Sequence, residues 1–111
     1  MAGTIKRLVG PAFLANAAAN IYNQGSALLY TVIRKMHFAN KTGAAVTIRI
    51  YVGATGGSAS GTELYFDYSI AANSEFNVYG ALRLDSTDFL TGLASSANAI
   101  IVILEGELVP V

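Results

Sequence analysis

The chain has 111 residues and no cysteine, which fits one domain and excludes disulfide bonds and thiolate metal sites. Seven basic and seven acidic residues give a net charge of zero, so no cationic excess exists for binding nucleic acid. No apolar run approaches the roughly 20 residues that a membrane-spanning helix requires, and residues 1–10 do not resemble a signal peptide, so we expect neither nucleic acid nor a membrane as a partner.

Charged residues make up only 13% of the chain, against about 25% in ordinary globular domains. A monomer of this mass exposes roughly 5,800 Å², so most of that area must be small polar or apolar side chains. A sparsely charged surface of this kind favours association. The composition therefore predicts a subunit that is largely covered by its neighbours, with a small monomer of neutral polar surface as the alternative.

Residues 4–14 have the aliphatic and β-branched character of a strand, but Gly10-Pro11 interrupts it. Proline donates no hydrogen bond to a β-ladder, so this segment is an edge strand, a bend or an extended arm. Its apolar side chains, which still require burial, are Ile5, Leu8, Val9, Phe13 and Leu14. We therefore predict that residues 1–14 form a strand or an arm laid on a neighbouring subunit, and that 15–111 form the sandwich domain.

A short strand is expected around residues 18–22, because the preceding alanine-rich stretch is too short for a stable helix. A turn follows at 23–26. The clearest pattern lies between Leu28 and Val52, where two alternating runs flank the turn residues 40–44. Two such runs joined by a short loop rich in Asn and Gly predict a β-hairpin.

Residues 53–61 are rich in glycine and serine and predict a surface loop, since no P-loop lysine accompanies them. Alternation returns at 62–70, and a turn at 71–74 leads to short strands at 75–79 and 81–84. The Asp-Ser-Thr-Asp sequence at 85–88 is typical of a tight turn or a helix cap. Residues 89–93 are expected to cover one end of the core.

The last strand, residues 98–109, is apolar on both faces. One face carries Ile100, Val102, Leu104 and Leu108, and the other carries Ala99, Ile101 and Ile103. A strand that is apolar on both sides is either covered twice or lies at an interface. The second face is thus a candidate subunit contact, unless a loop of the same chain, such as 81–96, covers it.

Six or more short strands with regular turns and no strong helix predict an all-β, antiparallel β-sandwich that is jelly-roll-like, with a small closed barrel as the alternative. The faces of the strands assign the core. Its expected members are Tyr30, Val32, Met36, Phe38, Val46, Ile48, Ile50, Leu64, Phe66, Ile70, Ile100, Val102 and Leu104.

No constellation of reactive groups is evident, so we expect no catalytic residue, no metal site and no cofactor. His37 is the single histidine, too few for a histidine metal cluster, and no nucleophile elbow accompanies it.

Asp85 and Asp88 are expected to form a turn, and Glu105 and Glu107 to lie at a solvated strand end. Arg34 is expected to pair with Asp67 or Glu63 or to mark the sheet rim. Four tyrosines, Tyr22, Tyr51, Tyr65 and Tyr79, would stack on sugars if they were exposed together.

Three stretches resemble small β-sandwich structural proteins of tailed bacteriophages. They are FANKTGAAVTIRIYVG at 38–53, IAANS at 70–74 and LTGLASSANA at 90–99. The resemblance implies a virion protein, assembled in the host cytoplasm, that decorates the capsid or associates with the neck, tail or fibre. Its partners would be other copies of itself and the major capsid or neck and tail proteins. A carbohydrate- or receptor-binding module of a virion is the alternative.

Combining the N-terminal segment with the outer side of the last strand gives a set of candidate contacts between subunits. They are Ile5, Leu8, Val9, Phe13, Ala99, Ile101 and Ile103.

Overall fold

The computed structural model describes residues 4–25, 28–53, 57 and 60–110, and no helix occurs within them. The strands are β1 (Thr4–Phe13), β2 (Ala19–Tyr22), β3 (Leu28–Asn40), β4 (Val46–Gly53), β5 (Glu63–Ile70), β6 (Glu75–Asp85), β7 (Phe89–Ala94) and β8 (Ile100–Pro110). Parts of three sequence predictions lie outside the described residues: 1–3 of the N-terminal segment, 26 of the turn at 23–26, and 54–56 and 58–59 of the glycine-rich loop.

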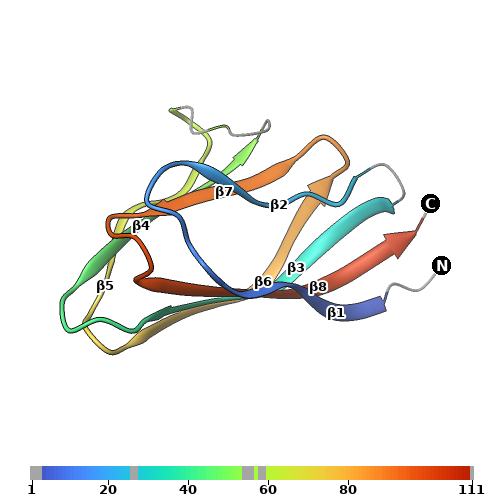
Figure 1. Cartoon of the computed structure of the whole chain (residues 1–111). Coiled ribbons are helices and arrows are strands. Elements are labelled where there is room, and N and C mark those ends of the chain that lie inside the picture. Colours follow the sequence, from blue (N-terminus) through green and yellow to red (C-terminus); the bar gives the residue numbers. More distant parts are fainter. Residues whose placement is uncertain (1–3, 26–27, 54–56, 58–59, 111) are drawn as a thin grey trace.

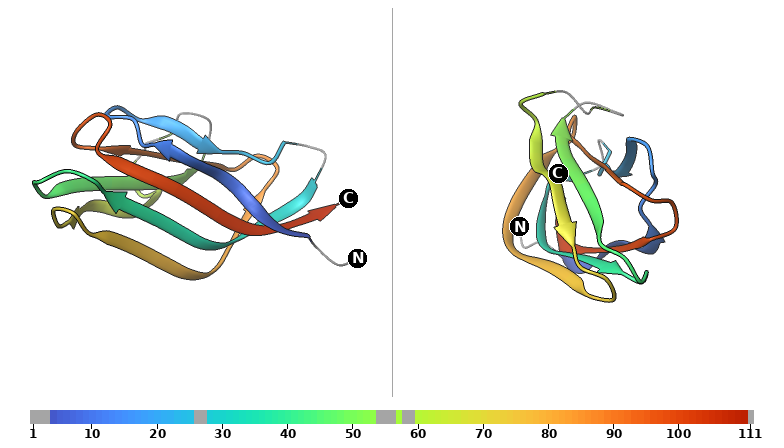
Figure 2. Two further views of the ribbon diagram at one scale, coloured as in Figure 1. Left: turned by 60° about the horizontal axis from the view of Figure 1, so that its bottom comes forward. Right: turned by 90° about the vertical axis from the view of Figure 1, so that its left-hand side faces the viewer.

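The strands form two four-stranded antiparallel sheets, in the orders β1-β8-β3-β6 and β2-β7-β4-β5 (Figure 1). The two sheets pack face to face as separate layers, seen end on in Figure 2. Among the described strands, only β4 and β5 are neighbours both in sequence and in a sheet. Eight strands that cross repeatedly between two sheets in this order make a jelly roll. The predicted all-β sandwich is confirmed, and the closed barrel is not formed.

The core fills the space between the two sheets. Of the residues predicted to be buried, the structure buries Met36, Phe38, Val46, Ile48, Ile50, Ile70, Ile100, Val102 and Leu104. Four others were wrongly assigned to the core. Tyr30 and Val32 are half-buried, and Leu64 and Phe66 are 38% and 55% exposed. Both errors trace to β-bulges that a strict period of two does not reveal.

The first bulge lies in β3 at Arg34. The ladder with β8 shifts register between Ile33 and Lys35, so β3 carries one extra residue relative to β8 there. The ladder with β6 shifts at the same place, but there the extra residue is on β6, between Tyr79 and Leu82. Before the bulge Thr31 and Ile33 point into the core, and after it Met36 and Phe38 do. Opposite the bulge lies Gly106, where a Cβ would meet the Val32 carbonyl oxygen at 2.3 Å, so the close approach of the two strands requires glycine.

The second bulge lies in β5. The register with β4 shifts between Ile48 and Ile50, and Asp67 has a φ of 54°, in the left-handed region. The faces therefore exchange within the strand: Ile70 is buried, but Phe66 points outward and Tyr65 packs against the core instead.

The predicted hairpin between β3 and β4 is wrong. β3 pairs with β6 and β8, whereas β4 pairs with β5 and β7, so the connection carries the chain from one sheet to the other. Asn40 holds this crossing. Its Nδ2 donates to the carbonyls of Ala44, Ile70 and Ala71, and its Oδ1 accepts from the amide and hydroxyl of Thr42. The buried Asn40 side chain thus ties this connection to the end of β5.

Three smaller expectations also change. The segment 89–93 is not a cover over one end of the core but part of β7, a central strand of the second sheet. Residues 75–84 form one continuous strand, β6. The described part of the N-terminal segment is an edge strand rather than an arm, because β1 pairs with β8 of the same chain from Thr4 to Phe13.

Candidate interaction surface

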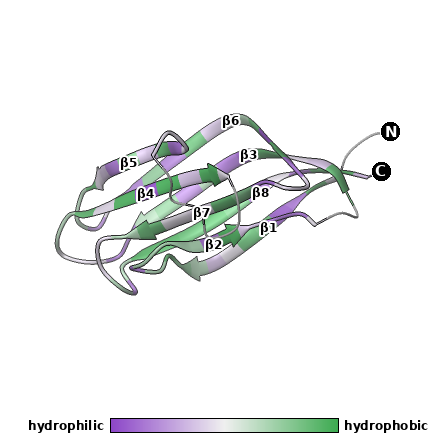
Figure 3. Ribbon diagram, turned by 90° about the horizontal axis from the view of Figure 1, so that it is seen from above, coloured by the Kyte–Doolittle hydropathy of each residue, from purple (hydrophilic) through white to green (hydrophobic). Residues whose placement is uncertain are grey.

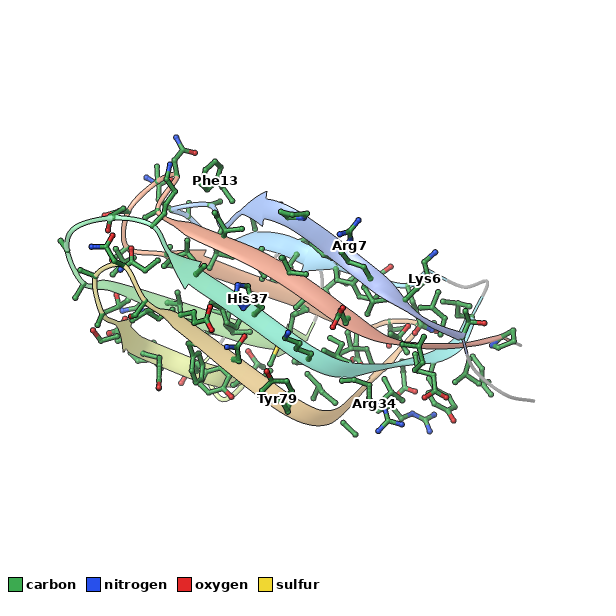
Figure 4. All side chains as sticks on the ribbon, turned by 90° about the horizontal axis from the view of Figure 1, so that it is seen from below. Lys6, Arg7, Phe13, Arg34, His37 and Tyr79 are labelled. Atoms are coloured by element: carbon green, nitrogen blue, oxygen red, sulfur yellow. The ribbon has the colours of Figure 1, made fainter. Side chains whose placement is uncertain are left out.

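The most distinctive surface is the side of the β1-β8-β3-β6 sheet that points away from the core, here called the outer face (Figure 4). Residues directly opposite each other on antiparallel strands point to the same side, so the register assigns this face in rows. In the strand order β1, β8, β3, β6, the first row is Phe13, Ile101, Ala39 and Glu75. The second row is Ile103, His37 and Asn77, without a β1 residue, because β1 shifts register at Gly10-Pro11. The third row is Arg7, Glu105, Lys35 and Tyr79. The fourth row is Ile5, Glu107, Val32 and Arg83.

One end of the outer face is apolar. Phe13 is 49% exposed and stands beside Ile101. Together with Pro11 and Ala12 these two residues line a shallow hollow of about 160 Å³. The Nζ of Lys41 lies 5.4 Å from the centre of the Phe13 ring, which places one cation at the rim of the hollow.

The middle of the outer face is polar, and its side chains form hydrogen bonds with one another. His37 Nδ1 lies 2.6 Å from the side-chain oxygen of Asn77, and the Asn77 amide donates to Glu75 at 3.2 Å. The histidine is therefore oriented by an amide, and no hydroxyl nucleophile bonds its ring in the described structure. Within the described residues, no cluster of three histidine or carboxylate side chains could hold a metal ion.

The third row alternates in charge along the sheet: Glu105 stands between Arg7 and Lys35. Among the described ion pairs, none joins these three residues. Lys35 instead lies 5.6 Å from the centre of the Tyr79 ring, and Tyr79 is 70% exposed. This row therefore presents alternating charges that can pair with charged groups of a molecule packed on the face.

Arg34, the residue at the bulge, pairs with Glu107 at 3.2 Å. The expected partners, Asp67 and Glu63, lie on the other sheet. Asp67 pairs there with Arg49 through two hydrogen bonds of 2.7 and 3.1 Å, and the Arg49 guanidinium also lies 4.1 Å from the Phe66 ring centre. The hydrogen bond from Arg49 holds the pKa of Asp67 below its usual value.

The structure separates the seven predicted contacts into two groups. Ile5, Phe13, Ile101 and Ile103 are on the outer face. Phe13, Ile101 and Ile103 lie near one end of it, and Ile5, which is 65% exposed, lies beyond the charged third row. Leu8 and Val9 pack against the core, and Ala99 is fully buried, so these three face inward.

The alternative that residues 81–96 cover Ile101 and Ile103 is wrong. Residues 81–85 belong to β6, at the edge of the same sheet, and 89–94 form β7 in the other sheet. Ile101 and Ile103 accordingly remain partly exposed.

The sequence gives no indication of a second hollow at the open side of the sandwich, between the edge strands β5 and β6. It has a volume of about 230 Å³ and an apolar lining that includes Ile33, Met36, Leu64, Val78 and Leu82. Arg34, at the bulge of β3, is also among its lining residues. Three aromatic rings cluster beside it: the Phe76 ring stacks on Tyr68 with centres 4.1 Å apart, and it meets Tyr65 edge to face with centres 5.3 Å apart.

The tyrosines that the sequence offers for sugar stacking do not form a platform. Tyr51 is 3% exposed, Tyr22 and Tyr65 are half-buried, and Tyr79 alone of the four is well exposed. The opposite sheet, seen from above in Figure 3, carries both hydrophilic and hydrophobic residues along its strands. There the Thr91 hydroxyl, next to Tyr51 across β4 and β7, donates to the Gly57 carbonyl.

No protein-family model, curated protein or solved structure matches this chain. In the described part of the chain, no helix is long and apolar enough to cross a membrane.

Proposed function

We propose that this protein is a non-enzymatic structural subunit of a bacteriophage virion, assembled in the host cytoplasm, which associates with copies of itself and with capsid or neck and tail proteins. The outer face carries the proposal. It presents Phe13, Ile101 and Ile103 on a sheet that no described segment covers, and an apolar patch on a weakly charged surface is typical of an association site.

Two further observations support a structural role. The jelly roll recurs in viral capsid domains, although it also occurs in lectins and cupins, so this support is an analogy of fold. The His37 imidazole bonds the Asn77 amide, which donates to the Glu75 carboxylate, and neither partner is the hydroxyl or thiol nucleophile that acyl transfer needs beside its imidazole base. The resemblance of residues 38–53, 70–74 and 90–99 to tailed-phage proteins supplies the virion setting.

The test is the double substitution Ile101→Asp with Ile103→Asp. Burying one aliphatic side chain contributes about 1.5–3 kcal/mol, and these two carboxylates would replace apolar contact in every copy. We expect the variant to fold, to sediment as a smaller species than the parent, and to be lost from particles. A matched control is Thr47→Asp with Ser69→Asp, which adds two carboxylates to neighbouring positions on the other sheet.

A parent protein that sediments as a monomer at high concentration and binds no particle would overturn the proposal. Unchanged assembly of the Ile101→Asp, Ile103→Asp variant would remove the outer face as the contact.

The carbohydrate-binding alternative lacks a comparable observation. A sugar platform needs exposed aromatic rings with polar partners in one groove, and Tyr79 stands alone among the candidate tyrosines.

A further inference from the structure

We infer that a second copy of this chain packs on the outer face across a two-fold axis that runs parallel to the strands, between β8 and β3. This inference rests on the proposed self-association and specifies its geometry. Two copies related by a two-fold axis use the same patch, so the patch must be complementary to itself. When two identical sheet faces meet, that axis lies in the plane of the interface, and it can run along the strands or across them.

An axis along the strands keeps each row in place and exchanges the strands. β8 then lies over the partner's β3, and β1 over the partner's β6. In the third row, Glu105 faces the partner's Lys35, and Arg7 faces the exposed ring of the partner's Tyr79. Each contact occurs twice, giving two opposite-charge pairs and two cation–aromatic pairs.

The apolar rows also match in this arrangement. Ile101 faces the partner's Ala39, and Ile103 faces the edge of the partner's His37 ring. All four residues are half-buried already, so their contact removes apolar area from water. The mismatched contacts fall at the rim of the patch: Phe13 faces the partner's Glu75, Ile5 faces the partner's Arg83, and Glu107, which pairs with Arg34, faces the partner's Val32.

An axis across the strands fails on the same rows. It keeps the strands in place and exchanges the second row with the third and the first with the fourth. Ile103 would then face the partner's Glu105, Ile101 would face the partner's Glu107, and His37 would face the partner's Lys35. At the rim this axis would place Phe13 against the partner's Ile5 and Glu75 against the partner's Arg83, which are favourable contacts. Its mismatches lie at the centre of the patch, where isoleucine against carboxylate leaves charge desolvated and unpaired, and this selects against the alignment.

The geometry of stacked sheets permits the first arrangement. Aligned sheets pack about 10 Å apart, with their strands rotated by about 30°. Residues near the axis are displaced least by this rotation, and Glu105 and Lys35 lie on the two strands that flank it. Their long side chains can meet across a 10 Å gap.

The size of the patch indicates a weak dimer. Four strands about 4.8 Å apart, with rows from Ile101 to Glu107, define roughly 600 Å² per copy once side chains are included. Two such patches bury about 1,200 Å², the lower end for specific interfaces. The apolar rows would therefore supply affinity, while the charged row sets the alignment.

A charge exchange tests the arrangement. Glu105→Lys opposes lysine to lysine across the axis, and Lys35→Glu opposes glutamate to glutamate. We expect each variant to associate at least tenfold more weakly than the parent in sedimentation. A 1:1 mixture should recover the parent's association as a heterodimer, because each contact then joins opposite charges. The double variant Lys35→Glu with Glu105→Lys should associate with itself.

Mixing also separates association from folding, since two misfolded chains would not rescue each other. If a reversed charge unfolds the chain, Glu105→Gln and Lys35→Gln replace the reversals, and each should weaken association by a smaller factor. The control is Arg49→Glu with Asp67→Lys, which exchanges an ion pair on the other sheet and should leave association unchanged.

The outcomes distinguish the two proposals. A monomeric parent would overturn both. A parent whose association is lost in Ile101→Asp with Ile103→Asp, but whose charge variants associate normally or fail to recover on mixing, would overturn the two-fold arrangement and leave the structural role standing.

Discussion

At the scale of single residues, Asn40 does the most to position the chain. It ends β3 and is 2% exposed, yet its side chain forms five hydrogen bonds at the crossing between the sheets. Its backbone amide also donates to the Ser74 carbonyl, at the turn between β5 and β6. The side chain thus ties two loops together at one end of the sandwich.

Truncating Asn40 to Ala should therefore destabilise the protein by at least about 2 kcal/mol, because buried carbonyls lose their donors and each unsatisfied group costs about 1–3 kcal/mol. Asn40→Asp should be no better, since it keeps the acceptor but removes both donated hydrogens. Gly43→Ala in the same loop, where an added Cβ meets nothing within 4 Å, should change stability by less than about 0.5 kcal/mol or raise it slightly. Urea unfolding of the three variants makes the comparison, and an Asn40→Ala value equal to that of Gly43→Ala would contradict it.

The sequence predicts the position of this loop but not its role. The turn residues at 40–44 mark where β3 ends, yet an Asn followed by Lys-Thr-Gly fits a hairpin and a crossing between sheets equally well. What decides between them is the set of carbonyls that Asn40 reaches at Ile70 and Ala71, about 30 residues further along the chain. Such a contact has no local signal in the sequence.

At the scale of elements, alternation predicts strands well and faces less well. β4 and β8 follow a strict period of two through their central residues, so Ile48, Ile50, Val102 and Leu104 are buried as expected. β3 and β5 each contain a bulge, and beyond it every side chain changes face. Arg34 and Asp67, which sit at the bulges, are charged residues inside apolar runs, and that break in pattern is the one signal that the sequence offers.

Mutations can measure this difference between strands. Ile48→Ala and Val102→Ala remove side chains that are at most 2% exposed, so each should cost about 1–5 kcal/mol, according to how far the cavity collapses. Phe66→Ala, at a position that simple alternation also assigns to the core, removes a ring that is 55% exposed and should cost under about 1 kcal/mol. Thermal or urea unfolding provides the values. Equal losses at Phe66 and Ile48 would mean that β5 presents its other face to the core.

At the scale of the whole molecule, the topology is what the sequence could not specify. A jelly roll pairs β1 with β8 and β3 with both β6 and β8, so its ladders join residues that are far apart in the chain. Local patterns locate most of the strands and the turns between them, although they miss β7 and divide β6 in two. They do not show which strands meet, and so the outer face, whose rows draw on four separated strands, could not be assembled from the sequence. The β8 residues of the outer face could be predicted from the sequence, because Ile101 and Ile103 are apolar on the side of a strand that is usually polar.

The long-range pairing of β1 changes what a deletion should do. Removing residues 2–9 takes away the ladder from Thr4 to Val9 and the side chains of Leu8 and Val9, which pack on the core. The edge of β8 then loses its partner, and Gly106, which lies beneath Leu8, becomes exposed. An unpaired apolar edge promotes pairing with other chains. We therefore expect the shortened chain to lose its cooperative thermal transition or to aggregate, rather than to remain a folded domain that assembles poorly.

Ile5→Ser is the matched control, because Ile5 is 65% exposed and points outward, and it should shift stability by less than about 0.5 kcal/mol. Circular dichroism melting and size-exclusion chromatography of the two variants test the expectation. A deleted chain that melts like the parent and stays soluble would show that β1 is dispensable for the fold and would favour an arm that serves a neighbouring subunit.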